Sequence, residues 1–207
     1  MMFEGGGMII EWLAEKWAVN DPLPEKCDLL VPIAHGATKD RLTRGAEAVA
    51  RKTTTAVTEL RDRYQLPFVA FGAFTGSENP ELERALKLKH FSGKYVGTVM
   101  STIEECLKVR ANLPIFVTVS NIVVVTDEAH SRRCRIVWKT FFPNAKVSIL
   151  SVKITETVDP ESPMEAYDKA WKVLFFQAVP TPLWWLLSLF GQKCLGRLEK
   201  LHTPLSK

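Results

Sequence analysis

The most regular pattern of hydrophobic and polar positions lies between Ser120 and Pro143. Ile122 to Val125 form an unbroken β-branched run, which is typical of a strand covered on both faces. The segment from Thr126 to Arg133 that follows is polar. Beyond it, apolar residues recur at the spacing of one helical face, namely Cys134, Val137, Trp138 and Phe141. We expect a buried strand, a polar turn and an amphipathic helix, with Pro143 ending the helix.

Other parts of the chain repeat this alternation of strand and helix. Four further segments predict strands: Asp28–Ala34, Leu66–Phe71, Tyr95–Met100 and Lys146–Ile154. Pro32 departs from a regular strand, because proline cannot donate a ladder hydrogen bond. Helices are expected from after Asp40 to about Tyr64, from the Asn79–Pro80 pair to about His90, and over Ser101–Leu113. Ser101 and Glu104 fit a capping box at the start of the last of these helices.

The alternation predicts an α/β fold, a three-layer Rossmann-like open parallel sheet of about five strands. A strand order of 3-2-1-4-5 would place the carboxyl ends of the first and fourth strands side by side, where ligands bind in such sheets. This order would bring His35 and Gly36 close to Thr126 and His130.

Extensions flank the predicted α/β domain, which covers residues 27–155. We expect residues 1–26 to form an N-terminal helical extension, with a helix over Met8–Trp17. Residues 156–207 are expected to form C-terminal helices, the first opened by a capping box at Ser162, Pro163 and Glu165. The apolar run Leu183–Phe190 is too short to cross a bilayer, which takes about 20 residues. It would pack on its own domain or in a homodimer. The alternative is peripheral membrane contact through residues 183–200.

Composition and charge exclude several classes of protein. The 27 basic and 23 acidic residues are spread along the chain, and no nucleic-acid motif is present, so we expect no nucleic-acid partner. The four cysteines are far apart and have no ligand spacing, so neither a metal site nor a disulfide framework is expected. The N-terminus has no signal-peptide pattern, which predicts a cytoplasmic protein. Dinucleotide, P-loop and α/β-hydrolase fingerprints are also absent.

Four segments in order resemble the YdcF-like family, the relatives of ElyC, SanA and YdcF. Their matching residues are Asp28, Val31, Gly36, Arg41 and Leu42; Phe71, Gly72, Glu81 and Glu83; Ser101, Thr102 and Glu104; and Val124, Val125, Thr126, His130 and Arg133. The resemblance covers roughly Cys27 to Leu150, and the fourth segment is the most specific. Glu105 stands where the family has asparagine, Cys134 where it has a small residue, and His35–Thr38 where it has a glycine-rich turn.

The resemblance implies a small-molecule pocket at the strand ends, with S-adenosylmethionine binding in one branch of the family and an envelope role in another. The ligand-binding residues would be His35, Gly36, Arg41, Thr102, Glu104, Thr126 and Arg133. His130 would be the acid–base residue and Asp127 would orient it, since an unperturbed histidine titrates near neutrality. Simpler interpretations stay open: a helix-start histidine, a surface Arg133 paired with Glu128, and Glu104 as a helix cap only.

Two functions follow from these residues. The first is binding of a small anionic or nucleotide-like molecule, a phosphorylated compound or S-adenosylmethionine, with histidine-based transfer or hydrolysis. Arg133 would clamp a phosphate or carboxylate through its planar guanidinium. The alternative is a non-enzymatic, envelope-related or membrane-peripheral factor that acts through its apolar C-terminal tail.

Overall fold

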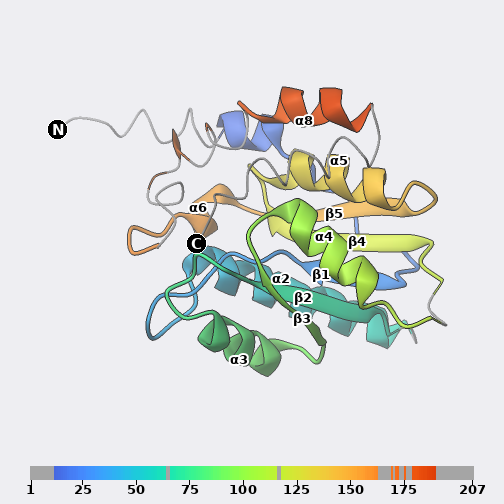
Figure 1. The fold of residues 1–207 in the computed structure, drawn as a ribbon, viewed down its shortest axis with the longest axis horizontal. Helices are drawn as coiled ribbons and strands as arrows, with labels where there is room; N and C mark the ends of the chain where they lie inside the picture. Colours follow the sequence, from blue (N-terminus) through green and yellow to red (C-terminus); the bar gives the residue numbers. More distant parts are fainter. Residues whose placement is uncertain are drawn as a thin grey trace, which may run out of the picture.

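The computed structural model describes residues 12–63, 66–115, 118–162, 169, 171–172, 175 and 179–189. It contains a five-stranded parallel sheet in the order β3-β2-β1-β4-β5, which confirms the predicted fold class and strand order (Figure 1). The strands are β1 (Leu29–Pro32), β2 (Phe68–Phe74), β3 (Lys94–Val99), β4 (Asn121–Asp127) and β5 (Lys146–Val152). The two predicted central strands are neighbours, with Leu29 opposite Ile122 and Pro32 opposite Val125.

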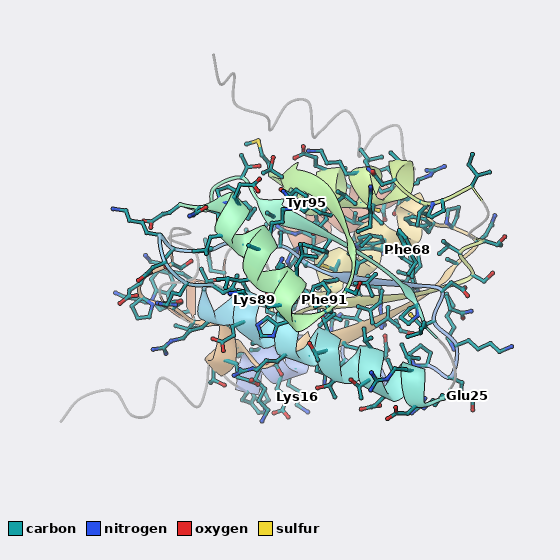
Figure 2. The ribbon with its side chains drawn as sticks, turned by 90° about the horizontal axis from the view of Figure 1, so that it is seen from below. Lys16, Glu25, Phe68, Lys89, Phe91 and Tyr95 are labelled. Carbon is teal, nitrogen blue, oxygen red and sulfur yellow. The ribbon has the colours of Figure 1, made fainter. Side chains whose placement is uncertain are left out.

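Helices cover both faces of the sheet, which makes three layers. They are α2 (Arg44–Asp62), α3 (Pro80–His90), α4 (Thr102–Ala111), α5 (Ser131–Phe141), α6 (Ile154–Thr157) and α8 (Thr181–Ser188). The apolar side of α4 and α5 packs with one face of the sheet, while α2 and the end of α3 pack with the other (Figure 1). Figure 2 looks onto the second face and labels Phe91, directly after α3. Its ring meets that of Phe71 of β2 edge to face, with 5.3 Å between the centroids.

Helix starts lie where the sequence predicts them, because their capping residues bind the free N–H groups of the first turn. The side chain of Asn79 accepts a hydrogen bond from Leu82 N–H at 3.0 Å, and Pro80 opens α3. Ser101 Oγ accepts one from Glu104 N–H at 3.1 Å. The Glu104 carboxylate in turn accepts a hydrogen bond from Met100 N–H at 2.7 Å, directly before the cap residue.

Strand ends differ from the prediction for identifiable reasons. β1 ends at Pro32 and not at Ala34. β2 continues past Phe71 to Phe74 because Ala73 and Phe74 pair with Thr98 and Val99 of β3, after a shift in register. β5 stops at Val152, since Ile154 already belongs to the short helix α6.

Segments before and after the α/β unit pack against it. Residues 12–17 are helical, and the chain after them covers the open edge of β5, where Asp21 N–H bonds the carbonyl of Ile149 at 2.7 Å. Helix α8 lies against α5 (Figure 1). Among the described residues, no helix is long and apolar enough to cross a membrane. The first turns of the predicted Met8–Trp17 helix and the predicted capping box at Ser162–Glu165 lie largely outside the described residues.

Candidate functional site

The carboxyl ends of β1 and β4 meet at one edge of the sheet, as the strand order requires. Ile33 N–H donates to the carbonyl of Val125 at 2.9 Å, so the chain leaves β1 directly beside the turn that follows β4. His35 and Asp127 are both buried, and His35 Nε2 lies 3.5 Å from Asp127 Oδ2. The residues that sequence reasoning placed at this edge are therefore neighbours in space.

His130 is the N-cap of α5 and is held on two sides. Its ring Nε2 lies 2.8 Å from the hydroxyl of Thr102, the first residue of α4. Its backbone N–H donates to Asp127 Oδ1 at 2.9 Å. The Asp127 carboxylate thus positions the main chain of His130, whereas the Thr102 hydroxyl contacts the ring.

Burial determines the charge of His130. Removal from water lowers the pKa of its imidazole well below the usual 6.5, and the neighbouring Arg133 and His35 lower it further. Burial also lowers the pKa of His35, against the opposing effect of Asp127. At neutral pH His130 is therefore a neutral imidazole that can accept a proton or a hydrogen bond.

A small cavity opens beside the Thr102–His130 pair. Its volume is about 60 Å³, which is room for a few water molecules or one phosphate-sized group. Its walls come from the ends of β1, β2 and β3 and from the first turns of α4 and α5. They comprise Ile33, Ala34, Phe74, Val99, Met100, Ser101, Thr102, Glu105, His130 and Arg133. Three of the predicted site residues, Thr102, His130 and Arg133, thus line one cavity.

A buried ionic cluster lies behind this cavity. Lys87 and Glu83, one turn apart on α3, are fully buried and form an ion pair of 2.8 Å. The Glu83 carboxylate also accepts hydrogen bonds from His35 N–H at 3.3 Å and from Phe74 N–H at 2.8 Å. Glu105 of α4 accepts one from Ala34 N–H at 3.1 Å. These carboxylates accept hydrogen bonds from N–H groups at the ends of β1 and β2.

Sequence reasoning did not assign Glu105 to the site. A signal was available, because Thr102, Cys106 and Val109 mark the buried face of α4 and Glu105 lies on that face, three residues after Thr102. A carboxylate at a position with core spacing is unusual enough to indicate a special environment.

Other predicted residues lie near the cavity without lining it. Thr126 is buried and receives a contact of 3.8 Å from the thiol of Cys134. Gly36 has a φ of +88°, which glycine adopts readily, and lies against Ser77 and Phe74. His35 and Asp127 form the buried pair behind His130.

Two predicted ligand-binding residues are engaged elsewhere. Arg41 makes a bidentate ion pair with Asp159, at 2.8 and 3.1 Å, and a second pair of 2.6 Å with Glu161. Glu104 pairs with Lys108 at 2.7 Å in addition to its bond to Met100 N–H. Neither Arg41 nor Glu104 lines the cavity.

Within the part of the chain that the structure describes, no group of three or more His, Cys, Asp or Glu side chains is arranged to hold a metal ion. Comparison of the chain with protein-family models, curated proteins and solved structures finds no match. The resemblance to the YdcF-like family accordingly stays a prediction that depends on the four segments.

Proposed function

We propose that the cavity binds the anionic group of a small molecule, a phosphate or a carboxylate, and that the neutral His130 acts on it as the acid–base residue. The observation that carries this proposal is that Thr102, His130 and Arg133 line the same cavity. The four segments that resemble the YdcF-like family point to the same strand ends.

The electrostatic setting favours an anion. Ser101 and Thr102 lie at the N-terminus of α4, and His130 and Arg133 lie at that of α5. Helix N-termini carry partial positive charge and present free N–H groups, so two of them at one cavity attract negative charge. The Arg133 guanidinium adds a full positive charge and a planar set of donors that matches an oxyanion.

The volume of the cavity restricts which part of a ligand it can hold. About 60 Å³ accommodates a charged group but not a whole nucleotide or S-adenosylmethionine. The rest of such a ligand would lie at the rim near Met100, whose side chain is 46% exposed. A phosphorylated or nucleotide-like compound with its anionic end in the cavity fits this arrangement.

The Thr102–His130 pair supplies the chemistry. A hydroxyl within hydrogen-bond reach of a neutral imidazole is the arrangement that activates hydroxyl groups in group transfer. His130 Nε2 would accept a proton from the Thr102 hydroxyl or from a water molecule bound beside it. Arg133 would hold the anion. Transfer or hydrolysis of a phosphorylated group is the reaction class that these roles suit.

A thermal-shift screen with nucleotides, phosphosugars and S-adenosylmethionine tests the proposal, because a ligand that binds the native state raises the melting temperature. Arg133→Gln should abolish the shift. Arg132→Gln is the matched control, since Arg132 donates to the Trp17 carbonyl and stacks over that indole. No shift with any compound, or an equal shift in both variants, contradicts the proposal.

Exposed apolar residues on α8 and directly after it favour a second candidate, a membrane-peripheral factor. Leu183, Trp185, Leu186 and Leu189 are exposed, and the sequence beyond α8 carries Lys193, Arg197 and Lys200. Apolar residues beside basic ones suit the interface of an anionic membrane. Flotation with anionic liposomes, lost on deletion of the residues after Pro182, would support this function. A chain that stays out of the liposome fraction would exclude it.

A further inference from the structure

Glu105 is the acidic member of a cavity whose other features attract anions. Its side chain is 1% exposed and lines the cavity together with Thr102, His130 and Arg133. Its carboxylate accepts a hydrogen bond from Ala34 N–H at 3.1 Å. An ionised carboxylate in this position would repel a bound anion across a small space of low dielectric constant.

Lys87 does not remove this conflict. Its ammonium is 2.8 Å from the Glu83 carboxylate and donates to the Gly72 carbonyl at 3.2 Å. Glu83 therefore neutralises Lys87, and the buried cluster of three is neutral only while Glu105 carries a proton. Ionisation of Glu105 leaves the cluster with one negative charge.

The groups around Glu105 come from several elements. Those that can bear charge are Glu83 and Lys87 of α3, His35 after β1, Asp127 at the end of β4, and His130 and Arg133 at the start of α5. Burial raises the pKa of Glu105 to about 7, although Lys87 and the backbone N–H of Ala34 oppose the rise. Near neutral pH the carboxyl group thus exchanges its proton at little cost, and a nearby anion shifts it to the protonated form.

We propose that Glu105 takes up one proton when the cavity binds an anion, and that the resulting carboxylic acid donates a hydrogen bond to an oxygen of that anion. This inference rests on the proposed function of the cavity. It adds Glu105 to the binding residues and makes the site specific for anions that present a hydrogen-bond acceptor. Binding should then be proton-coupled and should weaken as the pH rises above the pKa of Glu105.

Isothermal titration calorimetry with sulfate measures directly how many protons the protein takes up when it binds the anion. Sulfate keeps its charge near neutral pH, whereas phosphate titrates there, and at about pH 8 the two histidines with lowered pKa stay neutral. Titration in two buffers of different ionisation enthalpy gives the number of protons taken up. We expect about one proton per sulfate for the native protein and for Glu104→Gln, and none for Glu105→Gln, whose amide retains an oxygen to accept the Ala34 bond.

The pH dependence gives a second measurement that needs no variant. The sulfate dissociation constant of the native protein should increase about tenfold per pH unit above about pH 7 and stay nearly constant just below it. Sulfate binding without proton uptake, or uptake that persists in Glu105→Gln, overturns the inference and leaves the proposed anion site intact. Absence of sulfate binding at any pH overturns both.

Discussion

The Thr102 hydroxyl lies 2.8 Å from Nε2 of His130, so the first turn of α4 is bonded to the N-cap of α5. These residues follow β3 and β4, which are at opposite sides of the central β1–β2 pair. The bond joins two residues that line the cavity.

Replacement of Thr102 by valine keeps the shape of the side chain and removes the hydroxyl. The variant leaves Nε2 of His130 without this hydrogen bond. Because His130 is buried, we expect the free energy of unfolding to fall by about 1–3 kcal/mol. Urea denaturation measures the change. Thr55→Val is the control, because that exposed hydroxyl bonds only within α2, to the Arg51 carbonyl. Equal losses in both variants would show that the Thr102–His130 bond contributes nothing specific.

Replacement of Lys87 should lower the free energy of unfolding far more than replacement of the exposed Arg84 on the same helix. Lys87→Met leaves the buried Glu83 carboxylate without its counter-charge, which typically costs about 3–5 kcal/mol. Arg84→Met breaks the exposed pair with Glu81 and should cost at most about 1 kcal/mol. Chemical denaturation of both variants decides the matter. A mild Lys87→Met phenotype would mean that water reaches the cluster.

Glu105 should make the protein less stable in alkali than in mild acid. Its pKa is raised from 4.5 to about 7 in the folded state, so between these values the native state binds more protons than the unfolded state and stability falls as the pH rises. The loss is complete above about pH 7 and amounts to roughly 3 kcal/mol. Glu105→Gln should remove this component, so that the variant gains stability relative to the native protein as the pH rises, whereas Glu104→Gln should not. Urea denaturation over a range of pH measures the free energy of unfolding of each protein. If this free energy changes with pH in the same way for the native protein and Glu105→Gln, the raised pKa is disproved.

Arg41 should matter for stability and not for anion binding. Hydrogen bonds from Arg41 lower the pKa of Asp159 to about 2, so this pair stabilises the fold above the ordinary Asp value and loses its effect as the pH falls towards 2. Arg41 is partly exposed, so we expect Arg41→Ala to cost only about 1–2 kcal/mol at neutral pH. Sulfate affinity should not change. A large loss of affinity would restore Arg41 to the binding site.

The sheet could be predicted from sequence because its signals are local. The β-branched run Ile122–Val125, the cap at Asn79–Pro80 and the alternation of strand and helix each depend on a few consecutive residues. The strand order then followed from the rules of open α/β sheets and brought His35 and His130 to one edge.

The partners of individual side chains could not be predicted in this way. Arg41 and Thr102 both follow strand ends, but Arg41 is drawn to Asp159, which is 118 residues away along the chain. The buried Glu83 carboxylate accepts from His35 N–H after β1 and from Phe74 N–H at the end of β2, two groups that are 39 residues apart along the chain. Such long-range pairings have no periodic signature, so sequence patterns do not specify them.

The most direct test of the anion site is a sulfate titration at about pH 6 followed by ¹⁵N NMR of the histidine rings. We predict that the ring nitrogens of His130 shift and saturate, that those of His90 at the end of α3 do not, and that the Arg132→Gln variant behaves like the native protein. Arg133→Gln should abolish the shift. A His130 signal that sulfate leaves unchanged, or that shifts equally in Arg133→Gln, would contradict the account.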